Sequence, residues 1–505
     1  MITKKEIEAA DGTVFPAKSF QNNVLAPIFD IQKEHFFRCF IELTKAHVVM
    51  LKEQEIITPE DTAVIMKGIR EVEQIPFEER TYDPQFEDMF FMFEKALEDR
   101  IGSTVAGRVH IARSRNDIGV AEFRLAMRNE FVKVAEGVMR LQDTLLTLIS
   151  ENFDTVMPMY THTQPAQPST LSHYLLGMYD VLSRDMTRLF AAERSINRSP
   201  LGAAAITTTG FPINRDRVSE LLGFDGLVEN SYDCIAAADY SMEFAGALML
   251  LCVDMSRFVK DLLDWCTKEF GFFYLADGYV QKSSIMPQKR NPSSLEHCRP
   301  IVSKALAEAE AVFTIMHNTP YGDIVDSEEE LQEHIYLSVY YITRAMNVTA
   351  NVLGTMDINK ELLLKRAGEH FITVTELADT LVREVGLSFR EAHTITSRIV
   401  RKLYDGKQTA ENITQEFLNQ VSEEVLGRDV NIDATLIRQA LDPVHFVEIR
   451  SITGGPSPKT AEAMYRKRLE GYEEEKKTLR AIVKKYTELL VIFRIFPISS
   501  VSQPK

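Results

Sequence analysis

The sequence has no long apolar run, no CxxC pair and no excess of basic residues, and each absence excludes a class of protein. The most apolar stretch, Leu489 to Phe496, is interrupted by Arg494 and is too short to span a bilayer. The five cysteines are odd in number, which argues against disulfide staples and a thiolate zinc site and fits a reducing compartment. The formal charge of −16 argues against a general nucleic-acid or membrane-surface binder.

The opening residues do not have the pattern expected of a targeting signal. The start, MITKKEIEAADG, has basic residues with no apolar run behind them, so we expect no signal peptide and a cytoplasmic protein. The 505 residues, 45% of them hydrophobic, suffice for a large core. A chain of this length divides into roughly two to four domains. A small anionic substrate stays possible, because it would respond to a local basic pocket and not to the net charge.

Helical periodicity is the strongest pattern that the sequence does contain. From Leu171 to Leu189, and again from Phe244 to Leu262, apolar residues recur at alternating steps of four and three. Such stripes are typical of the seam of a helical bundle, and we assign them to core packing. Strand-like alternation is scarce, and we find no convincing internal repeat. The sequence therefore predicts an all-α protein of long helices.

Three polar stretches lie between the long helices and do not suit a core. The first, Ala112–Asp117, opens a predicted helix in which Ser114 and Asn116 are plausible caps. Amide groups at a helix start beside Arg115 would make a carboxylate site. A capped helix with a solvated arginine is the alternative.

The second stretch, Tyr160–Pro168, holds His162 in a polar turn. Pro165 and Pro168 restrict the chain before the next helix, which we expect to start near Ser169. A histidine in such a turn can act as an acid, a base or an orienting group. A hydrogen-bonded structural histidine is an equal alternative.

The third stretch, Lys282–Pro292, gathers two serines, two lysines and an asparagine around two prolines, and helix should resume near Ser293. A serine beside cationic and amide donors suits a proton abstraction, because preorganised donors must hold the developing negative charge. A disordered surface loop is the alternative, but Met286 and the prolines favour a shaped loop.

These stretches resemble a known family. The third, SSIMPQKRNP, resembles the signature loop of the fumarase/aspartase superfamily, and ARSRND and YTHTQPAQP resemble motifs of its argininosuccinate lyase branch. Later segments agree in the family's order: TELAD from Thr375, FREAH from Phe389 and GGPSP from Gly454. The resemblance extends from about residue 40 to about residue 460, and the chain is identified as a member of the argininosuccinate lyase family.

The resemblance implies a fold and an assembly. Members are all-helical, have three domains and form homotetramers around a core of twenty helices, with each active site shared between three subunits. By analogy we expect an N-terminal domain over 1–112, a central bundle over 113–365 and a C-terminal domain over 366–505. The implied partners are a small-molecule substrate and further copies of the chain, with no nucleic acid, membrane, metal or organic cofactor.

The implied chemistry is an anti β-elimination that releases fumarate from an N-succinyl amine. The expected catalytic residues are Ser283, His162, Glu296 and Lys289. The expected substrate-binding residues are Ser114, Arg115, Asn116, Thr161, Gln164, Lys282, Asn291, Tyr321 and Gln332. Ser283 would be the base, with Lys289 and Asn291 holding the developing charge. His162, paired with Glu296, would orient or protonate.

The sequence departs from the family pattern around the leaving amine. Lys282 replaces the glycine before the base, where its charge is expected to lower the serine pKa or to bind an extra carboxylate. Phe90 replaces a histidine, Thr44 a serine and Ala238 an arginine. The tyrosine and LQE segment that normally contacts the arginine end is spread over Tyr321 to Glu333 and includes an acidic run.

The departures leave alternatives for the substrate. Argininosuccinate, yielding arginine and fumarate, is the first, and another N-succinyl amine such as an aminopolycarboxylic acid is the second. The acidic run, Asp326 to Glu330, fits a cationic amine but equally a solvated helix edge. A crystallin-like structural protein would not need Ser283 and His162. The extension after residue 470 is expected to pack on the bundle or to contact a partner.

Overall fold

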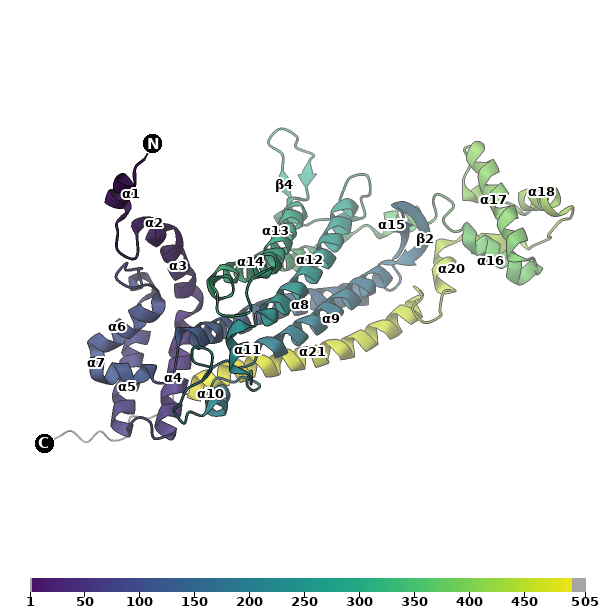
Figure 1. The fold of residues 1–505 in the computed structure, drawn as a ribbon. Helices are drawn as coiled ribbons and strands as arrows, with labels where there is room; N and C mark the ends of the chain where they lie inside the picture. The colour runs from purple at the N-terminus through teal and green to yellow at the C-terminus, as the bar shows by residue number, and fades with distance from the viewer. Residues whose placement is uncertain (1, 493–505) are drawn as a thin grey trace.

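The computed structural model describes residues 2–492, with side chains described through Thr487, and is predominantly helical (Figure 1). The expected all-α class is confirmed. Its centre is a bundle of long helices: α8 (Arg115–Ser150), α9 (Leu171–Ile196), α12 (Asp239–Trp265), α13 (Ser293–Met316) and α14 (Gln332–Leu353). Both predicted stripes face its core, where Leu175, Leu182, Phe244 and Leu251 are fully buried.

The N-terminal residues pack on one end of this bundle and share its hydrophobic core (Figure 1). Their elements are α1 (Lys4–Asp11), α2 (Lys18–Phe20), η1 (Gln21–Leu25), α3 (Ala26–His35), α4 (Phe37–Glu53), α5 (Pro59–Glu73), η2 (Phe77–Glu79), α6 (Met89–Ile101), α7 (Ser103–Ala106) and η3 (Gly107–His110). Helix α4 contacts α8 and is buried along most of its length. Two short helices, α10 (Arg215–Leu221) and α11 (Ser231–Ala236), lie between α9 and α12 in the chain.

A β-hairpin at the other end of the bundle was not predicted. Strand β1 (Val156–Thr161) pairs with β2 (Gln164–Thr170), and α9 begins at Leu171, two residues after Ser169, near which its start was predicted. An isolated hairpin is marginally stable, and this one lacks a strand-like sequence. Helices α15 (Lys360–Ala367) and α20 (Pro443–Glu448) pack against it and supply the missing support. Tertiary contacts therefore overrode weak local preference.

The remaining strands are pairs of two residues each. Strand β4 (Gln281–Lys282) pairs with β5 (Arg290–Asn291) at the base of the signature loop. Strand β3 (Phe273–Tyr274) pairs with β6 (Asp357–Ile358), and η4 (Asp277–Tyr279) lies between β3 and β4 in the chain.

The C-terminal helices divide into two groups. A separate core is formed by α16 (Val374–Val385), α17 (Phe389–Asp405), η6 (Ala410–Asn412), α18 (Gln415–Leu426) and α19 (Ala434–Leu441). The last helix, α21 (Pro458–Ile492), runs back along α8 and α9 (Figure 1).

Polar contacts fasten α21 to the bundle. Arg468 forms two hydrogen bonds with Asp180, at 2.8 and 2.9 Å, and Tyr472 donates to Asp143 at 3.2 Å. The extension thus packs on the bundle as far as its side chains are described. The predicted apolar patch, Leu489 to Phe496, lies outside the described side chains. Across residues 2–492, no helix combines the length and the apolar character needed to cross a membrane.

Candidate active site

The first site element is the start of α8, which the sequence located correctly. Ser114 is the N-cap and forms a capping box with Asp117. Asp117 is fully buried and also accepts hydrogen bonds from the amides of Gly202 and Ala204, at 2.9 and 3.0 Å. Burial raises the pKa of Asp117 to about 6, against the opposing effect of these amides and of Arg113. The cap therefore joins α8 to the loop that follows α9.

Arg113 and Thr44 explain one departure from the family pattern. The Arg113 guanidinium is buried, and it donates to the Thr44 hydroxyl at 3.1 Å. Burial lowers the pKa of Arg113 to about 10. Threonine carries a hydroxyl as serine does, so the replacement keeps an acceptor for Arg113 at this position.

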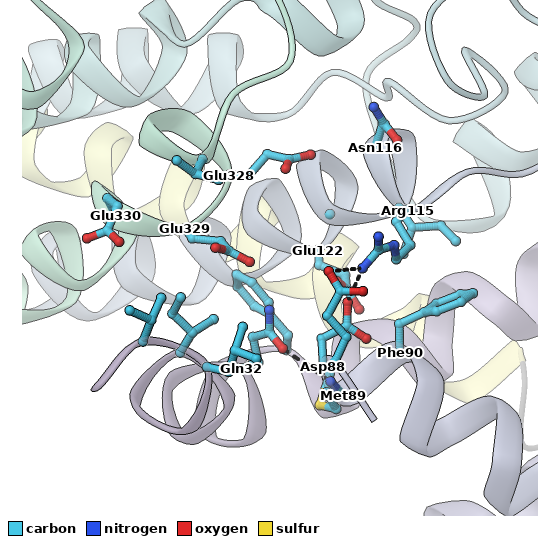
Figure 2. Close-up of a pocket in the computed structure, with 18 of the residues that line it drawn as sticks. Gln32, Asp88, Met89, Phe90, Arg115, Asn116, Glu122, Glu328, Glu329 and Glu330 are labelled. Carbon is cyan, nitrogen blue, oxygen red and sulfur yellow. Dashed lines mark hydrogen bonds and ion pairs between the residues drawn. The ribbon is translucent and has the colours of Figure 1, made fainter. Parts of the chain in front are cut away.

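Arg115 points away from the core toward two carboxylates. Its Nη1 lies 2.9 Å from Asp88 Oδ2 and 3.3 Å from Glu87 Oε1 (Figure 2). Asn116 donates to Asp323, and the Ser114 hydroxyl donates to Asn116 at 2.6 Å. A carboxylate ligand of Arg115 would compete with Asp88 and Glu87.

These residues border a cavity of about 370 Å³, which we call the acidic pocket (Figure 2). It lies between the N-terminal helices, the start of α8 and the segment before α14. Its charged lining is Glu87, Asp88, Arg115, Glu122, Asp323, Glu328, Glu329 and Glu330. The predicted acidic run is thus a π-helical turn, η5 (Asp326–Glu330), and Glu328 to Glu330 line this cavity.

Burial raises the pKa of three carboxyl groups of the acidic pocket, those of Glu122, Glu328 and Glu329. The Glu122 side chain is only 7% exposed, and its Oε1 has no hydrogen-bond partner among the described residues. Burial and the charge of Asp88 raise its pKa well above the usual value, opposed by Arg113. Burial, and then Asp323, raise the pKa of Glu328 to about 8. Such a pocket favours a cationic ligand.

Phe90 lines the acidic pocket, Gln332 follows the acidic turn in the chain, and Tyr321 lines a different hollow together with Asp233. Gln332, the first residue of α14, is buried and donates to the Glu328 carbonyl. The Tyr321 hydroxyl donates to Asp233 at 2.6 Å, and this hydrogen bond is the main cause that raises the pKa of Tyr321 to about 12. Phe90 packs edge-on against Phe40 with ring centroids 5.7 Å apart. The phenylalanine at the family's histidine position is therefore part of the core.

The second site element is the tip of the β1–β2 hairpin. His162 and Thr163 have φ values of 49° and 63°, as in a two-residue type I′ turn. Thr161, His162 and Gln164 are all exposed. Within the described chain no hydrogen bond or ion pair joins His162 to Glu296, which is exposed in the first turn of α13.

The third site element is the signature loop between β4 and β5. The Ser283 hydroxyl oxygen accepts hydrogen bonds from the amides of Met286, at 3.1 Å, and Ile285, at 3.4 Å. Two amide dipoles on this oxygen would stabilise its ionised form. The loop is shaped, as expected, by the bond from the Lys289 amide to the Met286 carbonyl at 3.0 Å. Lys282 and Asn291 lie in the two flanking strands.

One copy of the chain does not bring the three elements together. Arg115 opens α8, and the hairpin follows the end of that helix. Since α8 has 36 residues, these two elements are about 54 Å apart. Figure 1 shows β4 on a third projection, apart from both. The predicted residues therefore form three separate clusters, with Ser114, Arg115, Asn116, Tyr321 and Gln332 near the acidic pocket.

Sequence reasoning missed Glu122. It follows Arg115 by seven residues, so a helix beginning at Ser114 would place both on one face. That spacing was the available signal. Among the described residues, no group of three or more His, Cys, Asp or Glu side chains is arranged to hold a metal ion.

Comparisons with known proteins agree with the motifs. A family model described as lyase matches residues 20–306, and one described as argininosuccinate lyase C-terminal matches residues 371–448. The chain is 40% identical to argininosuccinate lyase 2 of Agrobacterium fabrum, covering 92% of this chain and 93% of that protein. It is 37% identical to argininosuccinate lyase of Methanocaldococcus jannaschii, covering 89% and 92%.

Solved structures give a second comparison. EDDS lyase in complex with formate is 32% identical, with a TM-score of 0.84 over 98% of this chain and 97% of that chain. A fumarate lyase:delta crystallin from Brucella melitensis is 19% identical, with a TM-score of 0.69 over 85% and 94%, which shows a shared fold alone.

Proposed function

Because the chain belongs to the argininosuccinate lyase family, we propose that it cleaves argininosuccinate to arginine and fumarate. The observation that carries this proposal is its similarity, over almost the whole length, to relatives called argininosuccinate lyase. It is a carbon–nitrogen lyase by family. The proposed setting is the reducing cytoplasm, supported by a sequence with five cysteines and no CxxC pair.

The proposed reaction begins at Ser283. Its ionised hydroxyl removes a proton from the succinyl carbon next to a carboxylate, giving a doubly charged aci-carboxylate. Lys289 and Asn291 hold that charge, and the amides of Met286 and Ile285 favour the ionised serine. The C–N electron pair then leaves with nitrogen, which takes up a proton from the group formed by His162 and Glu296. Fumarate and the amine are released.

We further propose a homotetramer in which three subunits build each site. Support comes from the length of α8, which keeps Arg115 and His162 of one chain far apart. Exposed apolar side chains on the bundle helices, among them Leu250, Val253 and Phe313, suit an intersubunit core of the twenty-helix kind. Apart from further copies of the chain, the proposed binding partner is the small-molecule substrate.

The acidic pocket supports a cationic leaving amine. Its carboxylates surround a single arginine, so they would attract the amine end of argininosuccinate and repel a polycarboxylate. The second candidate, another N-succinyl amine such as an aminopolycarboxylic acid, is favoured by the structural similarity to EDDS lyase. A crystallin-like structural role receives no support from the shaped Ser283 loop.

The test is fumarate absorbance when purified protein is offered argininosuccinate. We expect release by the wild type, near-complete loss in Ser283→Ala, and normal release in the matched control Ser284→Ala. If a well-folded wild type releases no fumarate, argininosuccinate is not the substrate. The reverse reaction would then be tested by incubating the protein with fumarate and a panel of amines, including aminopolycarboxylic acids.

A further inference from the structure

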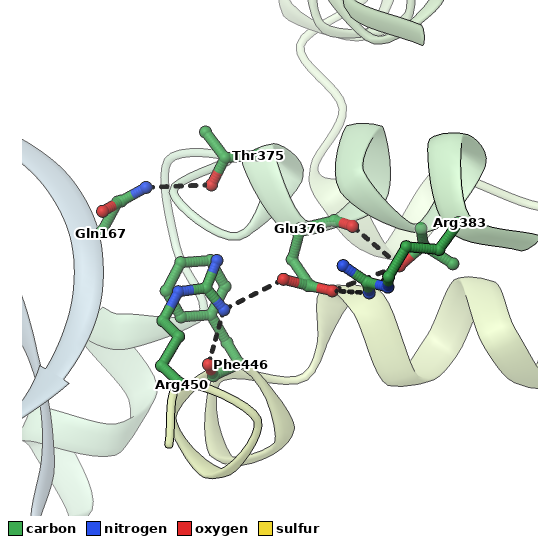
Figure 3. Close-up of polar contacts among 7 residues, drawn as sticks. Gln167, Thr375, Glu376, Arg383, Phe446 and Arg450 are labelled. Atoms are coloured by element: carbon green, nitrogen blue, oxygen red, sulfur yellow. Dashed lines mark hydrogen bonds and ion pairs between the residues drawn. The ribbon is translucent and has the colours of Figure 1, made fainter. Parts of the chain in front are cut away.

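Two motifs of the sequence, TELAD and GGPSP, have no task in the proposed reaction, yet both contact the β1–β2 hairpin or the helix that follows it. Gln167 on β2 donates to the Thr375 hydroxyl at 3.2 Å (Figure 3). Thr170, at the end of β2, donates to the Pro456 carbonyl at 3.5 Å, and His173 Nε2 donates to the Gly454 carbonyl at 2.9 Å. Segments about 80 residues apart therefore meet at the base of one hairpin.

Glu376 joins these two segments to each other. Its side chain is 2% exposed, and its Oε2 lies 3.0 Å from Arg450 Nη1, while Arg383 donates to its Oε1 (Figure 3). Arg450 also stacks on the Phe446 ring and donates to the Phe446 carbonyl at 2.6 Å. If the two segments separated, the buried Glu376 carboxylate would lose its Arg450 partner and keep Arg383 alone, which is costly for a buried charge.

Gly455, the second residue of the GGPSP motif, lies in a tight turn against the backbone of Arg450. A Cβ atom at this position would lie 2.1 Å from the Arg450 carbonyl oxygen, so a side chain does not fit. The turn is held by a bond from the Ser457 amide to the Arg450 carbonyl at 3.4 Å. Arg450 thereby ties the carbonyls of Gly454 and Pro456 to Glu376.

The contact on Gln167 falls where the hairpin bends. Gln167 is opposite Met159, and the register shifts between Met159 and Tyr160. Such an irregularity turns the strand beyond it. The hairpin therefore bends next to Gln167, the residue that Thr375 contacts, and this bend sets the direction of the tip, which carries Thr161 and His162.

We propose that Glu376 is a positioning residue for His162. We call the group that contacts the base of the hairpin the hairpin socket; it consists of Thr375, Glu376, Arg450, Gly454 and Pro456. Glu376 links the other members through its ion pair with Arg450, and the socket determines where the tip points. The role in catalysis rests on the proposed function, because it assumes that His162 serves the reaction. The socket itself does not rest on that assumption, and it can be tested without substrate.

The test uses Thr375→Val, which keeps the side-chain shape and removes the hydroxyl that accepts from Gln167. Glu376→Gln is the second variant. Glu424→Gln is the matched control, because it breaks an exposed ion pair with Lys402, at 2.5 Å, between α17 and α18. Hydrogen exchange of residues 156–170 is measured in the ligand-free full-length protein, together with kcat and KM for fumarate release.

We expect faster exchange in the hairpin of Thr375→Val, with α8 and α17 unchanged, and no effect of the control. We also expect kcat about tenfold to a hundredfold lower, since small misplacements of a catalytic group are costly. KM should stay within about twofold, because ground-state binding is retained. Faster hairpin exchange is expected in Glu376→Gln as well, because the variant weakens the contact with Arg450. If hairpin exchange is unchanged in either variant, or rises throughout the molecule, the proposal is overturned. A wild type without lyase activity would refute the proposed function. The exchange result would still show whether the socket residues order the hairpin.

Discussion

Glu328 in the acidic pocket keeps its carboxyl proton at pH values at which an exposed glutamate is ionised. Burial and Asp323 raise the pKa of Glu328 to about 8. The folded protein therefore keeps this proton at pH values where the unfolded chain has lost it. Stability should fall as pH rises from about 5 to about 8, and should change little above that range on account of this group.

The Glu328→Gln variant tests this linkage. We expect Tm of the wild type to decrease between pH 5 and pH 8 and the variant to lose part of that decrease, because an amide stays neutral throughout. Thermal unfolding is measured at unit steps of pH. The control is Glu333→Gln, at an exposed neighbouring position. Parallel curves for the wild type and Glu328→Gln would contradict the raised pKa.

At the scale of elements, the start of α8 serves both stability and binding. The Ser114 hydroxyl and the Asp117 carboxylate cap the helix reciprocally. Replacement of a capping serine by alanine costs about 1 kcal/mol. Because Ser114 is also assigned to the succinyl carboxylate, its loss should affect KM as well as stability.

A matched cap separates these two effects. Ser388 forms a capping box with Glu391 at the start of α17, within the separate C-terminal core. We expect Ser114→Ala and Ser388→Ala to lose about the same free energy of unfolding, about 1 kcal/mol each. Only Ser114→Ala should raise KM. Chemical denaturation and steady-state kinetics measure the two quantities, and equal KM values would remove Ser114 from the substrate site.

At the scale of the whole molecule, a shared site predicts complementation between inactive variants. Ser283→Ala and His162→Asn should each be inactive alone. If the two residues of a site come from different subunits, random mixing after dissociation should restore roughly one quarter of wild-type activity. Fumarate release after mixing is measured beside sedimentation analysis of the assembly. A monomer, or a mixture that stays inactive, would contradict the shared site.

The parts of the site that sequence reasoning located were those set by neighbouring residues. The cap at Ser114 rests on a capping box with Asp117, and the helix start at Ser293 follows Pro292, whose ring fixes the backbone; both were predicted. The hairpin was missed, because its support comes from α15 and α20. Phe90, predicted as a change in the site, lines the acidic pocket and also packs its ring against Phe40 in the core.

The sequence by itself determined the long helices, the bundle stripes and the family, because periodicity, caps and motifs are properties of adjacent residues. Only the tertiary structure decided that the buried Glu122, whose Oε1 has no hydrogen-bond partner among the described residues, lines an acidic pocket together with Arg115. It alone joined Gln167, Thr375 and Arg450 at the hairpin socket. The physical reason is that burial and pairing of charge depend on chain segments far apart in sequence, and no local pattern records which segments meet.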